Sequence, residues 1–228
     1  MNPLVLIPAR MAATRLPNKP LADIGGKPMI VRAYEAAAAS GLPTAVAAGG
    51  RAVLTDPDLP SGSDRIRAAL DAIDPGGAHD VVINLQGDMP FADPAISRLC
   101  ADLMAREPSC DIATLVAPEA SPEDRTNPDV VKAVLALDGT GRSGRALYFT
   151  RSTLYGDGPV WRHIGVYGYR RAALEAFCAA PQSPLERREK LEQLRALEMG
   201  LSIWAAVIDE APLSVDNPAD LEAARKLA

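Results

Sequence analysis

The chain has 228 residues, of which 48 % are hydrophobic and 23 % charged, as is ordinary for a globular protein. Its formal net charge of −5 argues against a nucleic-acid-binding face, although a few local cations would suffice for anionic substrates. No apolar run approaches the ~20 residues that span a bilayer, so no membrane partner is expected. The scattered cysteines, without a CxxC pair, fit a reducing cytoplasm and core positions for Cys100 and Cys178.

The first half of the chain alternates apolar strands with helices. Strands are predicted at residues 4–7, 44–47, 52–55 and 81–85, and helices at 29–40, 64–73 and 94–106. Continuous apolar runs are typical of strands buried on both faces, whereas helical spacing that ends at Gly41 indicates a helix with a C-cap. Strands that alternate with helices predict a mostly parallel sheet with helices on both faces.

The second half of the chain has a different pattern. Strands are predicted at residues 112–117, 130–137, 146–150, 163–169 and 202–208, and helices at 171–179, 185–199 and 218–227. Glycine-rich turns, such as the one at 138–141, favour an antiparallel or mixed extension of the sheet. No repeat, low-complexity tract or linker is found, so we predict a single domain over residues 1–228.

One interval conflicts with a parallel arrangement. Parallel neighbours need a crossover of a dozen or more residues, but only residues 48–51 separate the predicted strands 44–47 and 52–55. Either these strands form a hairpin, or the sequence lacks a helix-bearing segment near residues 47–51. We favour the missing segment.

A basic loop follows the first buried strand. Arg10, Arg15 and Lys19 place three cations within ten residues. In an open parallel sheet, loops at the carboxyl ends of the strands line the ligand crevice. Arg grips phosphate with a planar fork, and Lys supplies a compact charge. The alternative is a solvated loop, but the position after a buried strand favours phosphate binding.

Two aspartates are candidate metal ligands. Asp88 follows Gln86 and Gly87 at the end of another predicted strand, and Asp216 precedes a helix that begins near Pro218. Mg²⁺ takes one or two carboxylates together with phosphate oxygens and water. The alternatives are an Asx turn or cap for Asp88 and a helix N-cap for Asp216. Spacing alone does not decide between them.

Two further clusters are candidates for binding a polar ligand. His163 and Tyr167 share one face of a predicted strand, although a lone strand histidine is usually structural. Glu186, Glu189 and the pair 192–193 recur at helical spacing and would form a polar wall on one helix face. Most such charged faces are merely solvated.

Together these motifs resemble the 3-deoxy-D-manno-octulosonate (Kdo) cytidylyltransferase family, the CMP-Kdo synthetases of bacterial lipopolysaccharide synthesis. The likeness covers nearly the whole chain. The matching motifs lie at residues 8–21, 61–65, 86–90, 127–132, 149–151, 162–167, 183–195 and 215–221.

The resemblance implies a doubly wound α/β fold of the nucleotide-diphospho-sugar transferase type, CTP and Kdo as substrates, Mg²⁺ as cofactor, and a cytoplasmic homodimer. It implies nucleotide binding by Ala9, Arg10, Thr14, Arg15, Lys19, Ser61 and Gly62. It implies catalytic roles for Arg10, Lys19, Asp88 and Asp216, with both aspartates as Mg²⁺ ligands. It implies sugar-acid binding by Arg65, Gln86, Arg151, His163, Tyr167, Glu189, Glu192 and Gln193.

The sequence also departs from the family pattern. Ala13 and Met89 stand where the family has Ser and Glu, and the loop and helix that normally follow the family's second strand are missing. Two alternatives therefore stay open. One is a cytidylyltransferase for another acidic sugar of the sialic acid or amino-Kdo type. The other is a non-catalytic nucleotide-binding homologue.

Overall fold

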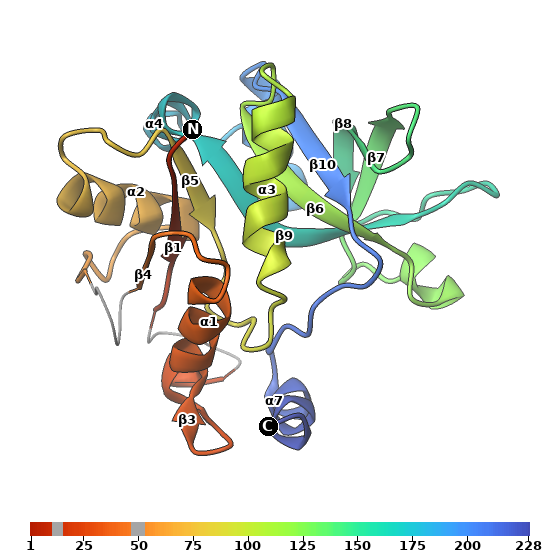
Figure 1. The fold of residues 1–228 in the computed structure, drawn as a ribbon. Helices are drawn as coiled ribbons and strands as arrows, with labels where there is room; N and C mark the ends of the chain where they lie inside the picture. The colour runs from red at the N-terminus through yellow and green to blue at the C-terminus, as the bar shows by residue number, and fades with distance from the viewer. Residues whose placement is uncertain (11–15, 47–52) are drawn as a thin grey trace. The chain divides into compact units, whose positions relative to one another are not determined.

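The computed structural model describes residues 1–10, 16–46 and 53–228 (Figure 1). Contacts group the chain into two compact units: Met1–Arg98 with Pro212–Ala228, and Leu99–Ala211. The prediction of one domain over residues 1–228 stays a prediction. Thr14, Arg15 and the interval at 47–51 lie outside the described residues.

The first unit contains three parallel strands. β1 (Pro3–Ile7) lies between β4 (Thr44–Val46) and β5 (Val81–Asn84), and it pairs in parallel with both (Figure 1). Helices α1 (Met29–Ala38) and α2 (Gly62–Ile73) form the crossovers. All four residues of β5 are buried, as a continuous apolar run predicts.

The predicted strand at 52–55 is wrong. Residues 53–56 form no regular structure, and Leu54 is 94 % exposed, so this apolar pair does not enter a sheet. The crossover from β4 to β5 is therefore the α2 segment, which is long enough for parallel strands. Because no strand forms at residues 53–55, residues 48–51 do not have to connect two parallel strands, and the conflict with a parallel sheet does not arise.

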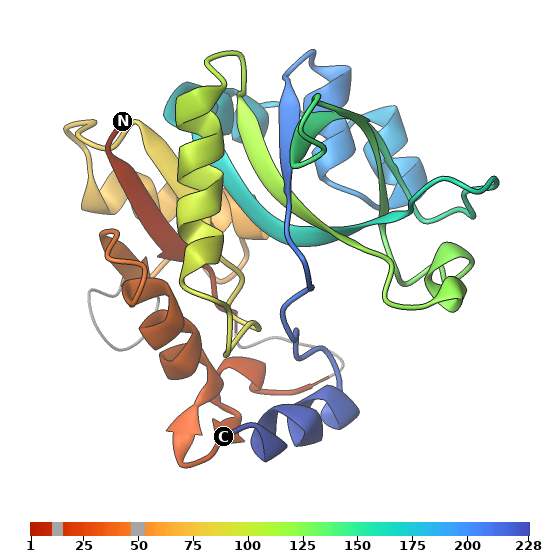
Figure 2. The same ribbon diagram turned by 45° about the vertical axis from the view of Figure 1, so that its right-hand side comes forward.

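The end of the chain returns to the first unit. Helix α7 (Pro218–Lys226) packs beside the ribbon of β2 (Asp23–Ile24) and β3 (Lys27–Pro28) (Figure 2). The buried residues of this contact are Ile24, Met29, Val215, Leu221 and Ala224. Fully burying an Ile, Met, Val or Leu side chain stabilises the fold by about 1.5–3 kcal/mol, and Ala contributes less. The contact thus holds the segment before α7 against the start of the chain.

The second unit contains five strands. They are β6 (Ile112–Pro118), β7 (Lys132–Leu137), β8 (Ser143–Thr150), β9 (Trp161–Arg170) and β10 (Ile203–Val207). Their order is β9-β6-β10-β8-β7, and β7 also pairs with β9, so the outer strands of this set meet. Only the pairing of β10 with β6 is parallel. The predicted mixed extension is confirmed.

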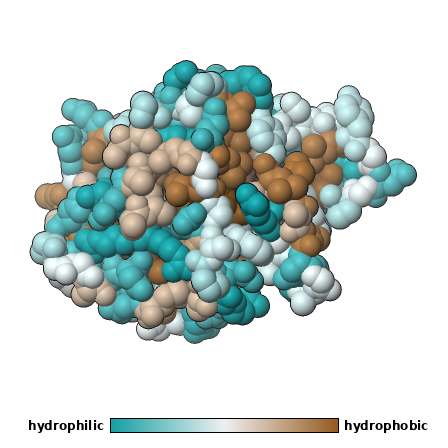
Figure 3. Space-filling view, turned by 90° about the horizontal axis from the view of Figure 1, so that it is seen from above, coloured by the Kyte–Doolittle hydropathy of each residue, from teal (hydrophilic) through white to brown (hydrophobic). Residues whose placement is uncertain are grey.

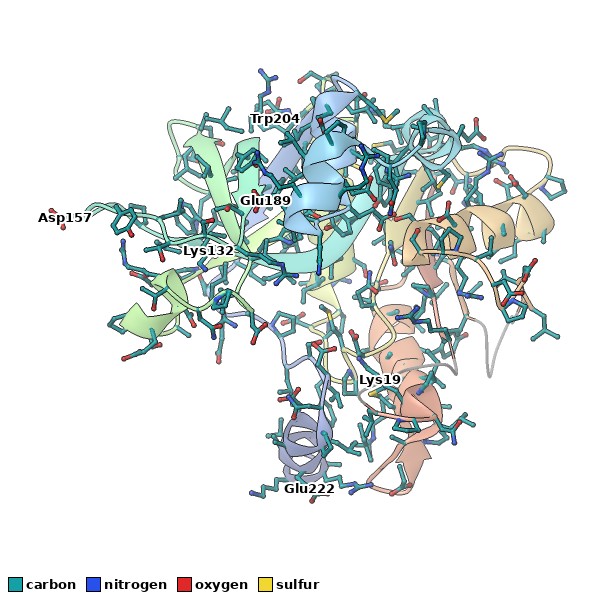
Figure 4. All side chains as sticks on the ribbon, turned by 180° about the vertical axis from the view of Figure 1, so that it is seen from behind. Lys19, Lys132, Asp157, Glu189, Trp204 and Glu222 are labelled. Carbon is teal, nitrogen blue, oxygen red and sulfur yellow. The ribbon has the colours of Figure 1, made fainter. Side chains whose placement is uncertain are left out.

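Helices flank these strands. Helix α3 (Ala95–Arg106) lies in front of them in Figure 1, and Figure 4, from behind, shows helices over the opposite face. The others are α4 (Arg171–Ala179), α5 (Pro184–Glu189) and α6 (Gln193–Glu198), and the short 3-10 turn η2 spans Pro122–Arg125.

The single helix predicted at 185–199 is wrong. Lys190 adopts the left-handed conformation at φ 56°, which ends α5, and α6 begins three residues later. Glu186, Glu189 and Glu192 therefore do not stack along one continuous helix face. Glu186 instead closes a capping box with Ser183 at the start of α5.

Cys100 and Cys110 are thiols without a disulfide partner. Cys100 and Cys110 are buried, and burial raises the pKa of both, that of Cys110 to about 12. The prediction of a core position is confirmed for Cys100, whereas Cys178 is only partly buried. Neutral buried thiols of this kind are structural.

The surface mixes hydrophobic and hydrophilic residues on the face seen in Figure 3, as is normal for folded chains. Within the described parts of the chain, no helix combines the length and the apolar character that crossing a bilayer requires.

Candidate active site

A cavity of about 350 Å³ opens in the first unit where β1 and β5 end. The carboxyl ends of parallel strands are the usual place for a ligand crevice. The predicted site residues that line this cavity are Ala9, Arg10, Lys19, Ser61, Gly62, Arg65, Gln86, Asp88 and Asp216. Residues predicted from separate motifs are thus brought to one place.

Lys19 lies between two carboxylates. It begins the 3-10 turn η1 (Lys19–Leu21), and Figure 4 labels it. Its Nζ donates to Asp88 Oδ2 at 2.8 Å and to Asp216 Oδ1 at 3.0 Å. Burial is the largest influence on the pKa of Lys19 and lowers it, but the two carboxylates together outweigh burial, so the pKa lies above its ordinary value. The Lys19 ammonium group therefore stays protonated and lies between the two aspartate carboxylates.

A short hydrogen-bond network places Asp216 beside Asp88. The Val215 N–H donates to the Asp88 carbonyl at 2.9 Å, which joins the two segments directly. The N-cap of α7 is Asn217, which forms a capping box with Asp220. The cap role that the sequence left open for Asp216 therefore falls to its neighbour, and the Asp216 carboxylate contacts Lys19 instead.

Gly87 sets the position of the loop that carries Asp88. A Cβ at Gly87 would lie 2.9 Å from the Pro8 carbonyl oxygen and 3.0 Å from Ile30 Cδ1. Only glycine permits so close an approach of this loop to the end of β1. Beside it, the Gln86 amide donates to Asn84 Oδ1 at 3.3 Å.

The N-terminus of α2 borders the same cavity. Ser61 is its N-cap and accepts from the Asp64 N–H at 3.1 Å, while Ser61 and Gly62 line the cavity. The partial positive charge of a helix N-terminus favours anions. Arg65, 7 % exposed, donates to Thr55 Oγ1 at 2.7 Å and so holds the preceding loop. Its predicted contact with the sugar acid stays a prediction.

In the second unit, His163 and Tyr167 are adjacent aromatic side chains. The ring centroid of His163 lies 4.9 Å from that of Phe149 and 5.4 Å from that of Tyr167. Burial lowers the pKa of His163 to about 3. Burial, with smaller effects of Tyr169 and Glu192, raises the pKa of Tyr167 well above its usual value. Both side chains are therefore neutral at pH 7.

Comparison with known proteins shows the family. Residues 4–203 match a family model described as Cytidylyltransferase. A 3-deoxy-manno-octulosonate cytidylyltransferase of Parvibaculum lavamentivorans is 56 % identical over 98 % of this chain and 92 % of its own length. Another, of Rhodospirillum centenum, is 55 % identical over 99 % of this chain and 93 % of its own. The chain belongs to the 3-deoxy-manno-octulosonate cytidylyltransferase family.

Solved structures agree with the membership in this cytidylyltransferase family. A CMP:2-keto-3-deoxy-manno-octonic acid synthetase complexed with CTP matches with a TM-score of 0.89 and 34 % identity, over 100 % of this chain and 98 % of that one. A 4-diphosphocytidyl-2C-methyl-D-erythritol synthase from Anaerococcus prevotii, at a TM-score of 0.63 and 11 % identity, shares the fold alone. The predicted fold class and resemblance are confirmed.

Length also separates this cytidylyltransferase from its relatives. The span aligned with the Parvibaculum relative is 238 residues, longer than the 228 residues of this chain. The relative therefore contains, within the aligned span, residues that have no counterpart in this chain. Their predicted place near residues 47–51 stays a prediction.

Several polar groups predicted for sugar-acid binding in this cytidylyltransferase already have protein partners. Glu189, labelled in Figure 4, accepts from Arg188 at 3.0 Å, Tyr148 at 3.4 Å and Thr150 at 3.5 Å. Its side chain is 15 % exposed. A ligand hydroxyl would therefore join an existing hydrogen-bond cluster at this carboxylate.

The other predicted sugar-acid residues of this unit differ in exposure. Arg151 donates to the Pro128 carbonyl at 2.9 Å, which leaves further guanidinium donors. Glu192 accepts from Arg195 at 3.4 Å, and Gln193 is buried. Their contact with a sugar acid stays a prediction.

Sequence reasoning missed two buried polar contacts that lie near the predicted sugar-acid residues of the second unit. Thr114 is fully buried in β6 and contacts His163, and its signal was a lone hydroxyl within an apolar run. Glu186 and Arg195 form a buried bidentate pair at 2.9 and 3.1 Å, whereas the sequence spacing predicts that Glu186 belongs to the polar wall. The nine-residue spacing of this pair matches no local helix pattern.

The carboxylates suit a magnesium ion. Among the described residues, no group of three or more His, Cys, Asp or Glu could hold a metal. Mg²⁺ needs only one or two carboxylates when phosphate oxygens and water complete its shell. Asp88 and Asp216, which converge on one ammonium, fit that requirement.

Proposed function

We propose that this chain activates Kdo with CTP, giving CMP-Kdo and pyrophosphate. The observation that carries the proposal is the convergence of Lys19, Asp88 and Asp216 in a cavity that Arg10 and the start of α2 also line. This combination supplies cations for a triphosphate and carboxylates for a metal. Family membership narrows the nucleotide and the acceptor to CTP and Kdo.

The reaction is an in-line displacement. The anomeric hydroxyl oxygen of Kdo attacks the α-phosphorus of CTP, an oxygen–phosphorus bond forms, the bond to pyrophosphate breaks, and the proton of the hydroxyl passes to solvent. Such transfers need positioning and charge neutralisation more than covalent help. Arg10 and Lys19 would neutralise the charge that develops on the leaving pyrophosphate. The amide groups at the N-terminus of α2 would hold phosphate oxygens.

We propose Mg²⁺ as the cofactor, held by Asp88 and Asp216. It would supply charge neutralisation on phosphate and lower the pKa of the attacking hydroxyl. Lys19, which now neutralises both carboxylates, would then be available to a phosphate oxygen. The homodimer and the cytoplasmic location stay predictions from the resemblance.

The decisive experiment is pyrophosphate release from CTP and Mg²⁺ with Kdo, an amino-Kdo and a sialic acid compared in parallel. We expect turnover with Kdo, loss of turnover with EDTA, and recovery when Mg²⁺ is restored. Preferred turnover of another acid would favour the alternative sugar. CTP binding without pyrophosphate release would contradict the enzyme and support a non-catalytic homologue. The variant Asp71→Asn serves as the control, because Asp71 pairs with Arg67 on α2 and is not among the described residues that line the cavity.

A further inference from the structure

Thr114 is a buried polar residue in the otherwise apolar strand β6. Its Oγ1 lies 2.8 Å from the Val166 carbonyl oxygen, 3.2 Å from the Ile164 carbonyl oxygen and 3.0 Å from His163 Nε2. One hydroxyl thus contacts two backbone carbonyls and one imidazole nitrogen.

A bulge in β9 produces this arrangement. Thr114 pairs with Tyr167 and Leu115 pairs with Ile164, so the register between β6 and β9 skips Gly165 and Val166. A bulge redirects side chains and leaves ladder groups to find other partners. The carbonyls of Ile164 and Val166 are turned toward the Thr114 hydroxyl.

The hydroxyl has a single hydrogen to donate. Both carbonyl oxygens can only accept, and an oxygen–oxygen distance of 2.8 Å without a hydrogen between them would oppose two sets of lone pairs. The hydrogen of Thr114 therefore lies toward Val166. The Thr114 oxygen is left as an acceptor, so Nε2 of His163 must carry a hydrogen and donate it.

The second ring nitrogen of His163 follows from this assignment. Burial keeps the imidazole neutral at pH 7, because it lowers the pKa to about 3. A neutral imidazole carries one hydrogen, and that hydrogen is on Nε2. Nδ1 therefore has a lone pair, and no described residue hydrogen-bonds to it. The rings of Phe149 and Tyr167, which pack beside His163, limit its rotation.

We infer that Thr114 is a positioning residue that fixes His163 as the Nε2–H tautomer, so that Nδ1 acts only as a hydrogen-bond acceptor for a hydroxyl of the sugar acid. A carboxylate also only accepts, so it is excluded from Nδ1. His163 would thus select for a hydroxyl rather than for the acid group of the substrate. The assignment of that hydroxyl to the sugar acid rests on the proposed function, whereas the assignment of the His163 tautomer does not.

The first test reads the tautomer in the unmodified protein. The chain has only two histidines, so ¹⁵N-histidine labelling gives two ring systems, and a His79→Asn variant assigns them. At pH 7 we expect a protonated Nε2 and an unprotonated Nδ1 at His163. A protonated Nδ1, or an imidazolium, would overturn the inference whatever the enzyme's activity.

The second test removes the Thr114 hydroxyl. Thr114→Val should give a mixture of tautomers and raise KM for Kdo about tenfold, with KM for CTP unchanged, since one substrate hydrogen bond is weakened. Thr114→Ser keeps the hydroxyl and should retain the wild-type tautomer and KM. Equal changes in both KM values, or a serine variant that behaves like valine, would contradict a positioning role.

The third test separates this inference from the proposed function. Kdo added to labelled wild-type protein should shift the Nδ1 resonance of His163 while Nε2 stays protonated. A fixed tautomer without any shift would show that Thr114 orders the ring but that Nδ1 does not accept from Kdo, which overturns the ligand half of the inference. A protein that shows the shift but releases no pyrophosphate would instead refute the proposed activity.

Discussion

The two units bring together side chains of opposite character at their candidate binding residues. In the first, formal charges converge: Lys19 lies between Asp88 and Asp216 beside a cavity. In the second, neutral groups meet: His163 and Tyr167 are uncharged at pH 7. The contrast is consistent with the proposed division of labour, in which charge binds a metal–triphosphate in the first unit and buried neutral groups such as His163 and Tyr167 contribute to binding of the sugar acid in the second.

The largest effect is expected at the charged cluster. Asp88→Asn should lower kcat about 10³-fold, because it removes a carboxylate proposed to hold the Mg²⁺ that neutralises charge on the transferring phosphoryl group, while changing the affinity for CTP less than about tenfold. Steady-state kinetics and CTP titration measure the two quantities. Asp71→Asn should change neither. Equal losses of turnover and affinity would argue that Asp88 contributes to binding alone.

A smaller effect is expected at the buried ion pair of the second unit. Arg195→Met would leave the Glu186 carboxylate buried without its bidentate partner, and it should lower the free energy of unfolding by about 3 kcal/mol in urea titrations. The side chains of this pair are 8 % and 6 % exposed. Asp71→Asn, which weakens the exposed pair of Asp71 with Arg67, should cost about 0–1 kcal/mol. Similar losses in both variants would mean that burial does not strengthen the pair.

The smallest effect compares two helix caps, one in each unit. Asn217→Ala and Ser183→Ala each remove a capping box and should each lower the free energy of unfolding by about 1 kcal/mol. Only the first cap adjoins Asp216, so only Asn217→Ala should also reduce kcat. An equal reduction in kcat in the Ser183→Ala variant would contradict the expectation that only the cap beside Asp216 affects turnover.

Apolar runs predicted most of the fold. The strands at β1 and β5 and the helix α1 were placed to within two residues, because burial on both faces leaves a continuous apolar signature. Val53 and Leu54 are also an apolar pair, but they form no strand, so the prediction of a strand there was wrong. The helix end at Lys190 was not predicted, because the left-handed conformation there is adopted by a lysine and not by the glycine that usually marks such a position.

The site was predictable in its parts but not in its geometry. The resemblance supplied Lys19, Asp88 and Asp216, whereas their convergence depends on segments 197 residues apart and on the hydrogen bond from Val215 to Asp88. No local pattern encodes that contact. Thr114 was missed because its role depends on a bulge in another strand, and register is a property of the folded sheet.

The return of the chain to the first unit has a consequence during synthesis. Domains fold as the ribosome releases them, and the residues up to Arg98, which include Lys19 and Asp88, emerge first. Asp216 emerges more than a hundred residues later, after the whole second unit. A nascent chain therefore carries Asp88 without Asp216 until the second unit has been synthesised, so the proposed metal site can form only after translation has passed residue 216.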